Sequence, residues 1–289
     1  MKLVLAACIA VLLASCQRPP PANTHYVLGA PYEAGGIWYY PRESYEGEQT
    51  GLATTYTKKP GPLTADGEVF DQSALAGAHQ TLQLPAVARL TNLENGLQVI
   101  VRINDRGPAT PHRLLEVTRR TATLLQFAHD DGVRVRLEIL PMESYAAVDA
   151  VPGAPKLNVA AAPVIAVRQS ELPPPGSTAQ PTAMREPIEP AEREPAAAPI
   201  ERLPETVTQM TASPGRLFIR LGTFQSHANA DIQRAKVAAL GAGIVSTPQG
   251  RKQSSYRVVI GPLANVEQAD KVLDQVLRAG VTDARIVVE

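Results

Sequence analysis

Three residues that could exchange protons with a substrate lie within one stretch of the chain, residues 51–108. They are Glu68, His79 and Asp105. Carboxyl and imidazole groups are the side chains that most often act as general acids and bases. Taken one at a time, each also has an ordinary structural explanation: a turn carboxylate, a buried histidine, or an ion pair with Arg106. A chemical role therefore requires that the fold bring the three into one cleft.

A predicted β-hairpin positions the last of these residues. Residues 89–103 alternate apolar and polar side chains on both sides of Asn95-Gly96, the dipeptide typical of a tight primed turn. The second strand ends at Asn-Asp-Arg-Gly-Pro, residues 104–108, where Gly and Pro indicate a turn. A rigid strand thus delivers Asp105 to a loop, which is where functional residues tend to lie.

The hairpin belongs to a predicted all-β domain that spans residues 51–140. Residues 133–140 alternate cleanly and are expected to form the closing strand. Residues 118–125 are expected to form a short helix with Thr118 as its N-cap. A small closed barrel would leave no exposed strand edges.

Five short motifs in this stretch resemble the rare lipoprotein A (RlpA) family. In chain order they are Gly-Leu-Ala-Thr-Thr-Tyr-Thr at 51–57, Thr-Ala-Asp-Gly-Glu at 64–68, Gly-Ala-His-Gln-Thr-Leu at 77–82, Leu-Thr-Asn-Leu-Glu-Asn-Gly at 90–96 and Asn-Asp-Arg-Gly-Pro at 104–108. Five motifs in the family's order are far more specific than one. The resemblance implies a six-stranded double-psi β-barrel, and some members of the family are lytic transglycosylases that act on peptidoglycan.

The resemblance places the family's functional trio at Asp105, Glu68 and His79. Asp105 is expected to be the acid and base, with a pKa raised by burial and by Glu68. Glu68 would stabilise charge or serve as a second carboxylate, and His79 would hydrogen-bond a carboxylate or the substrate. Tyr56 and Arg106 are expected to bind substrate. No cofactor is expected, and a metal site is disfavoured because the three residues have no tight ligand spacing.

The implied reaction needs no activated water, because the muramic acid 6-hydroxyl attacks its own anomeric carbon and leaves a 1,6-anhydro end. Three departures from the family motifs bear on this activity. Residues 54–57 lack the family's tryptophan, Asp66 stands in place of Asn, and Glu116 in place of Asp. The alternative is therefore a non-catalytic glycan-binding or scaffold lipoprotein.

The first residues indicate export and lipid attachment. Lys2, an apolar run over residues 3–13 and small residues before Cys16 are typical of a secretory signal at residues 1–15. Leu-Ala-Ser-Cys resembles the bacterial lipobox, which implies a lipidated Cys16; an ordinary signal with a chance cysteine is the alternative. The Gln that follows implies, by convention, the outer membrane, on the inner leaflet that faces the periplasm. Cys8 would be lost with the signal, so no disulfide is expected.

Residues 16–50 are expected to form a lipidated N-terminal arm. Residues 25–41 carry the only Trp and four of the eight Tyr, too aromatic a composition for a disordered spacer. An ordered arm that packs on the barrel explains this composition. The alternative is a sugar-stacking platform formed by Trp38, Tyr39 or Tyr40.

A second small domain is expected after a flexible linker. Residues 141–213 are rich in Pro, Ala and Glu, and this composition is typical of a mobile linker. Residues 214–289 contain two βαβ halves, which indicate an α+β ferredoxin-like sheet. They resemble the SPOR domain, with departures at Arg220 and Leu263. The resemblance implies binding to peptidoglycan glycans without stem peptides, which are enriched at division septa.

The exposed face of that sheet is the candidate glycan-binding surface. Its candidate side chains are Phe218, Arg220, Phe224, Tyr256 and Arg257. The three aromatic residues have packing inside the sheet as their alternative explanation.

The formal net charge is zero, and no basic cluster with interleaved aromatics is present, so nucleic acid is not an expected partner. We expect a lipid-anchored protein of the cell envelope that cleaves MurNAc–GlcNAc linkages of peptide-poor glycan at the division septum. Peptidoglycan, the membrane and divisome proteins are its candidate partners.

Overall fold

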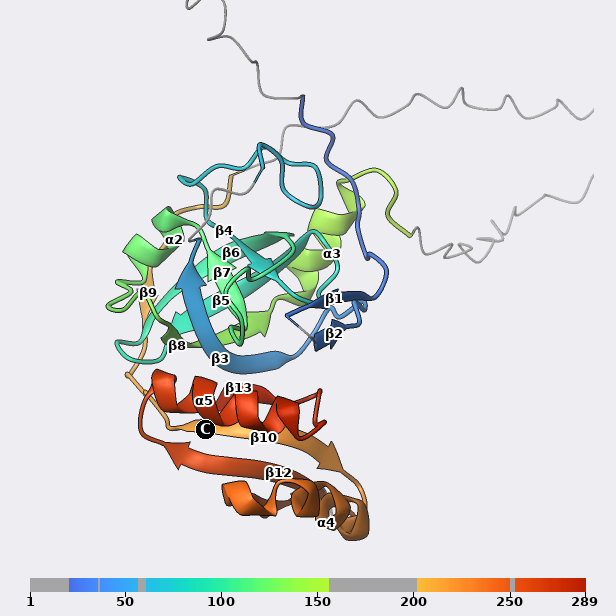
Figure 1. Cartoon of the computed structure of the whole chain (residues 1–289). Helices are drawn as coiled ribbons and strands as arrows, with labels where there is room; N and C mark the ends of the chain where they lie inside the picture. The colour runs from blue at the N-terminus through green and yellow to red at the C-terminus, as the bar shows by residue number, and fades with distance from the viewer. Residues whose placement is uncertain (1–20, 36, 57–60, 156–201, 250–252) are drawn as a thin grey trace, which may run out of the picture.

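The computed structural model describes residues 21–35, 37–56, 61–155, 202–249 and 253–289. They form a β-barrel and a smaller α+β unit, which lie one above the other in Figure 1. The expected signal peptide, Cys16 and residues 156–201 of the expected linker lie outside the described residues. Within the described ranges, no helix is both long enough and apolar enough to span a bilayer.

Six strands close into the expected barrel. They are β3 (Glu48–Thr55), β4 (Ala76–His79), β5 (Ala86–Asn92), β6 (Leu97–Asp105), β7 (Leu115–Val117) and β8 (Val133–Ile139). Their order is β4-β7-β3-β8-β5-β6, and a parallel pairing of β4 with β6 closes the ring. A second parallel pair joins β3 to β7. Alternate apolar side chains of β8 point into a fully buried core, as the sequence pattern predicts.

The β5–β6 hairpin is present, but the prediction of a tight primed turn is wrong. A loop of residues 93–96 joins the strands, and Gly96 N donates to the Asn92 carbonyl at 2.8 Å. A primed type I turn needs positive φ at both central residues, whereas here only Gly96 has it, at 79°. A Cβ on Gly96 would lie 2.0 Å from the Met210 carbonyl oxygen, so a passing segment also requires glycine here.

The ends of the expected linker are folded onto the barrel. Helix α3 (Pro141–Asp149) packs against β5, where the Ser144 hydroxyl bridges the Val87 N–H and carbonyl at 3.0 Å each. Strand β9 (Thr208–Gln209) pairs with β6. The expected linker is therefore ordered at both ends, through the buried Ser144 contact at one end and through backbone pairing of exposed residues at the other. Helix α2 (Arg119–Leu124) has the predicted N-cap, Thr118.

The described part of the N-terminal arm is ordered and packs on the barrel. It contains the hairpin β1 (Tyr32–Ala34) and β2 (Ile37–Tyr39). Val27 pairs with Leu84 through two backbone hydrogen bonds of 2.8 Å, and Asn23 N donates to the Gly67 carbonyl at 2.9 Å. The prediction of a packed arm is confirmed for these residues.

The C-terminal unit has the predicted ferredoxin-like fold. Its elements are β10 (Leu217–Phe224), α4 (His227–Lys236), a 3₁₀ turn (Ala238–Leu240), β11 (Gly243–Gln249), β12 (Gln253–Leu263), α5 (Val266–Arg278) and β13 (Arg285–Val288). The antiparallel strand order is β11-β12-β10-β13. Alternate residues of β10, β12 and β13 pack with both helices in one apolar cluster.

The five residues of the expected glycan-binding surface lie on two different sides of the C-terminal sheet. Phe218, Arg220 and Arg257 alternate with the residues of the apolar cluster, so they lie on the open face of the sheet. Phe224 and Tyr256 instead pack against the cluster. A register shift between residues 220 and 222 of β10 interrupts the alternation of the strand, so Phe224 lies on the other side of the sheet from Phe218 and Arg220.

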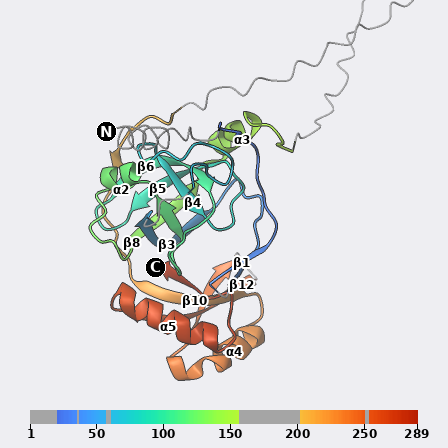
Figure 2. The same ribbon diagram turned by 45° about the horizontal axis from the view of Figure 1, so that its top comes forward.

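The two units contact each other directly. Arg113 of the barrel is 5% exposed and binds both carboxylate oxygens of Asp270 on α5, at 2.7 and 3.0 Å. The Thr50 hydroxyl on β3 donates to the Val288 carbonyl at 2.8 Å and accepts from its N–H at 3.2 Å. Leu52 of β3 joins the apolar cluster of the C-terminal unit. Figure 2 shows this unit against the end of the barrel where β3 runs.

Candidate active site

A cleft of about 320 Å³ opens where β6 ends. Its lining includes Asp105, Tyr56 and Glu116 from the barrel, and Tyr39 from the arm. The barrel alone therefore does not complete the cleft, because the arm supplies part of its wall.

Asp105 lies in the cleft with its carboxylate largely buried. Its Oδ1 accepts hydrogen bonds from the N–H groups of Ala65 at 2.9 Å and Arg106 at 2.8 Å. Burial raises the pKa of Asp105, and these hydrogen bonds oppose the shift. The predicted direction is thus correct, but Glu68 is not among the groups that cause it. A carboxyl group that keeps its proton to a higher pH than an ordinary aspartic acid can act as an acid catalyst.

Glu116 is a second carboxylate in the cleft, and the sequence analysis did not place it there. Asp105 on β6 and Glu116 on β7 flank the same residue, Ala78, on the β4 strand between them. Two strand spacings put their Cα atoms about 10 Å apart. Glu116 Oε2 accepts from Ala109 N at 3.1 Å and lies 3.7 Å from where a Cβ on Gly107 would be. Its only signal in the sequence was the departure from the family's Asp.

Tyr56 lines the same cleft as these two carboxylates. Its hydroxyl is 3.5 Å from Asp105 Oδ2. Burial, followed by the negative charges of Asp105 and Glu116, raises the pKa of Tyr56. The phenol therefore stays protonated and is available as a hydrogen-bond donor in the cleft, as expected for a substrate-binding residue.

Glu68 lies beside the cleft and does not line it. Its Oε1 accepts from Arg102 Nε and its Oε2 from Asn104 Nδ2, both at 2.6 Å. Both partners belong to β6, and Asn104 directly precedes Asp105. Glu68 is therefore placed to hold the end of β6 in position.

Asp66 is buried next to Glu68 and has the most unusual environment among the barrel carboxylates described. Its Oδ1 accepts from the Thr64 hydroxyl at 2.7 Å and from Glu68 N at 3.2 Å. Burial, and then the charge of Glu68, raise the pKa of Asp66 to about 7. The Asp66 carboxyl therefore keeps its proton to a higher pH than an ordinary aspartic acid does.

His79 is fully enclosed behind the cleft wall. Its Nδ1 accepts from the N–H groups of Thr81 at 3.1 Å and Leu82 at 3.2 Å, so Nε2 carries the proton of the neutral ring. Burial, and then the positive charge of Arg106, lower the pKa of His79 to about 3. The ring shapes the turn after β4 and does not reach the cleft lining.

Arg106 lines the cleft, yet its guanidinium binds the protein backbone. It donates to the carbonyl oxygens of Leu28 at 2.7 Å, Leu82, and His79 at 3.4 Å. The side chain thus ties the arm to the loop after β4. The geometry favours a positioning role over the substrate contact expected from the sequence.

Elsewhere in the described ranges, no group of three or more His, Cys, Asp or Glu side chains is arranged to hold a metal ion. On the open face of the C-terminal sheet, Arg257 pairs with Glu289 at 2.8 Å.

The fold and the cleft define a class of protein: a closed barrel that carries a buried carboxyl group as a candidate acid catalyst, followed by a ferredoxin-like domain. A family model described as "Lytic transglycolase" matches residues 48–137, and a SPOR domain model matches residues 213–286. The chain is 32% identical over 279 residues to the "Endolytic peptidoglycan transglycosylase RlpA" of Pseudomonas aeruginosa (strain UCBPP-PA14), which covers 93% of this chain and 79% of that relative. The chain therefore belongs to the RlpA family.

Two further relatives with the same name match shorter parts of the chain. The protein of Rickettsia felis is 35% identical over 124 residues, 42% of this chain and 54% of the relative. The protein of Escherichia coli (strain K12) is 47% identical over 88 residues, 30% of this chain and 24% of the relative.

Proposed function

We propose that this protein is an endolytic peptidoglycan transglycosylase whose acid and base is Asp105. The observation that carries the proposal is the largely buried Asp105 carboxyl in the cleft, with its raised pKa. Membership of the RlpA family, whose relatives bear that activity in their names, supports it.

In the proposed reaction, protonated Asp105 donates its proton to the oxygen of the glycosidic bond between MurNAc and GlcNAc. The bond from that oxygen to the MurNAc anomeric carbon breaks, and GlcNAc leaves with the proton. The Asp105 carboxylate then takes the proton of the MurNAc 6-hydroxyl, whose oxygen bonds to the anomeric carbon. The product is a 1,6-anhydro ring, and no water is consumed.

The neighbouring residues take supporting roles in this proposal. Glu116 faces the positive charge that develops at the anomeric carbon, and the Tyr56 phenol hydrogen-bonds Asp105 or the sugar. Glu68 positions β6 beneath the acid, and His79 positions the turn after β4. Glu116 thereby takes the role of second carboxylate that the family resemblance gave to Glu68.

We also propose where the enzyme acts. A lipid on Cys16 would hold it at the outer membrane, facing the periplasm. The SPOR domain would bind glycan strands without stem peptides and so enrich the enzyme at the division septum, where divisome proteins are candidate partners. In this view the chain comprises a signal at residues 1–15, an arm at 16–50, the barrel, a linker centred on 156–201 and the SPOR domain at 214–289.

The test uses the chain from Gln17 onward and peptidoglycan sacculi stripped of stem peptides, with products read by mass spectrometry. We expect anhydro-ended fragments from the unmodified chain and a rate at least about 100-fold lower for Asp105→Asn, which keeps the Oδ1 acceptor but cannot carry the proton. Exposed Asp130→Asn is the matched control and should keep full activity.

Two results would overturn the proposal. Fragments with ordinary reducing ends would mean that the enzyme is a hydrolase. An absence of fragments, with the protein still pelleting on the sacculi, would leave a non-catalytic glycan-binding lipoprotein.

A further inference from the structure

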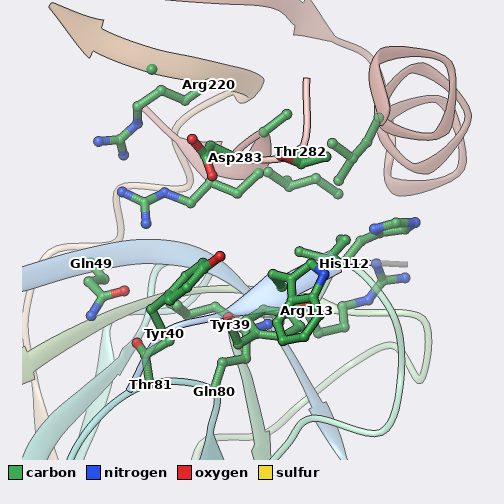
Figure 3. Close-up of a pocket in the computed structure, with 18 of the residues that line it drawn as sticks. Tyr39, Tyr40, Gln49, Gln80, Thr81, His112, Arg113, Arg220, Thr282 and Asp283 are labelled. Atoms are coloured by element: carbon green, nitrogen blue, oxygen red, sulfur yellow. The ribbon is translucent and has the colours of Figure 1, made fainter. Parts of the chain in front are cut away.

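A second cavity lies at the contact between the two domains and adjoins the catalytic cleft. It measures about 480 Å³ and is lined by both units. Figure 3 shows Arg220 and Asp283 of the C-terminal domain on one side, and Tyr40, Gln49 and Gln80 on the other. We call it the interdomain pocket.

Three arginines gather at this pocket, and in the described ranges none of them forms an ion pair. Arg220 on β10 and Arg285 on β13 are directly opposed across the two strands, so both side chains lie on the open face of the sheet. The pocket lining also includes Arg42 of the arm. In the described ranges, none of the three has an acidic group within 4.0 Å, and Arg220 Nε is buried without a hydrogen-bond partner.

The arginines destabilise one another in the absence of a ligand. Burial, and then the charge of Arg285, lower the pKa of Arg220, and the negative charge of Glu289 opposes this shift. Burial, and then the charge of Arg42, lower the pKa of Arg285, and nearby Asp283 offsets this shift only in part. Like charges that oppose each other across strands are unfavourable, so the cluster is suited to an anion that would neutralise it.

Three other ionisable side chains of the pocket already have partners. Arg113 binds Asp270, Glu48 pairs with Arg136 at 3.2 Å, and His112 Nε2 lies 3.0 Å from Asp274 Oδ1. The pocket's positive charge without an ion-pair partner is therefore that of Arg42, Arg220 and Arg285, and Asp283 is an acidic residue beside them.

Exposed aromatic side chains line the same pocket. Trp38 is 54% exposed and Tyr40 is 63% exposed. Tyr39, between them in sequence, stacks on Tyr32 with ring centroids 5.3 Å apart. Large exposed aromatic rings beside unpaired cations suit a ligand that has both sugar rings and negative charge.

The pocket is continuous with the catalytic cleft. Ile37, Tyr39, Gln80 and His112 line both. A strand whose reacting bond lies at Asp105 could therefore extend past Tyr39 into the interdomain pocket.

We propose that the interdomain pocket binds a muramic acid residue of the same glycan strand that occupies the cleft, with the free lactyl carboxylate held by Arg42, Arg220 and Arg285 and a sugar ring against Trp38 or Tyr40. A stem peptide converts that carboxylate into a neutral amide, so the pocket would select peptide-free glycan at the point of cleavage. The inference rests on the proposed function, because it takes a peptidoglycan strand as the ligand.

The test measures binding without turnover. Trp38 is the only tryptophan of the chain, so its fluorescence reports on this pocket alone. The chain from Gln17 onward, with Asp105→Asn to prevent cleavage, is titrated with a peptide-free GlcNAc–MurNAc octasaccharide and with the same octasaccharide after conversion of its carboxylates to methylamides. We expect a saturable change in Trp38 emission and an affinity at least about tenfold lower for the amidated glycan.

Variants locate the carboxylate. Arg285→Gln and, from the other domain, Arg42→Gln should each lower the affinity for the free-carboxylate glycan at least about fivefold and leave the affinity for the amidated glycan unchanged. Arg278→Gln, at the exposed end of α5, is the matched control and should behave as its parent. Equal affinity for the two glycans, or equal behaviour of Arg285→Gln, Arg42→Gln and Arg278→Gln, would overturn the inference.

The two proposals fail separately. Anhydro products from the unmodified chain with no discrimination between the two glycans would remove the pocket assignment and leave the enzyme. Discrimination by charge with no products would remove the enzyme and leave a two-domain glycan-binding site.

Discussion

At the scale of single residues, Asp66 offers the sharpest test of the barrel's electrostatics. Its pKa rises from 3.8 to about 7 on folding, so the stability that its protonated form contributes is lost as the pH rises through this range. Asp66→Asn keeps the Oδ1 acceptor and cannot ionise. We predict that this variant gains stability relative to the parent between pH 4 and pH 8, by on the order of 3 kcal/mol.

Urea unfolding at several pH values measures this gain. Asp149→Asn, on the exposed side of α3, should show no such gain. A difference between Asp66→Asn and the parent that stays constant with pH would mean that Asp66 is ionised in the folded protein.

The sequence indicated the position of some site residues and not of others, because the orientation of each side chain depends on its immediate surroundings in the fold. Asp105 and Tyr56 both line the cleft. The alternating pattern of residues 97–103 predicted the strand that ends at Asp105, whereas Tyr56 was expected only from the family resemblance. His79 and Glu68 also belong to family motifs, yet the His79 ring is buried and the Glu68 carboxylate binds side chains of β6. The orientation of a loop side chain depends on the residues that it contacts, such as Arg102 for Glu68, and the spacing of residues in the sequence does not predict these contacts.

At the scale of elements, Arg106 holds the arm and the loop after β4 together. Its guanidinium donates hydrogen bonds to the backbone carbonyl groups of Leu28, Leu82 and His79. We predict that Arg106→Lys, which loses the planar fork, lowers the free energy of unfolding by at least about 2 kcal/mol. Urea unfolding measures the loss, and Arg89→Lys, at an outward pair with Glu138, is the control.

A contrary result for Arg106 has a distinct meaning. If Arg106→Lys keeps full stability and weakens only glycan affinity, then the guanidinium contacts the substrate as the sequence analysis expected.

The junction of the arm with the loop at residues 64–68 depends on one glycine. Gly67 has φ of 83°, and a Cβ there would lie 2.1 Å from the Asn23 carbonyl oxygen. Gly67→Ala should therefore release residues 21–30 from the barrel, at a cost of about 1–3 kcal/mol. Limited proteolysis of the arm reports this release. Gly153→Ala, with φ of 78° but no atom within 4 Å, has similar strain without the clash and should leave the arm protected.

Patterns of alternation and repeat predicted the elements well and the irregularities poorly. The barrel strands and both βαβ halves were predicted because their side chains repeat with a fixed period. The turn at Gly96 and the side of Phe224 differ from expectation, since a crossing segment near Met210 and a register shift in β10 set them. Both causes involve contacts distant in sequence.

At the scale of the whole molecule, composition predicted two domains but gave no sign that they would contact each other. The Arg113–Asp270 pair, the Thr50–Val288 bonds and the burial of Leu52 all join segments more than 150 residues apart. Such contacts depend on how the surfaces of the two folded domains fit each other. The periodic pattern of apolar residues within one domain predicts its own helices and strands and not these contacts.

Asp270 is the test of whether this contact holds the domains together. Asp270→Ala leaves the buried Arg113 guanidinium without its acidic partner. This loss destabilises the state in which the two domains are in contact by on the order of 3 kcal/mol, and it does not affect the state in which they are apart. We therefore predict a larger radius of gyration by small-angle X-ray scattering, and separate thermal transitions of the two domains. Asp231→Ala, whose partners His227 and Arg234 both belong to α4, should match the parent. If Asp270→Ala also matches it, Arg113 does not fix the domains, and the interdomain pocket must form through the Thr50 and Leu52 contacts instead.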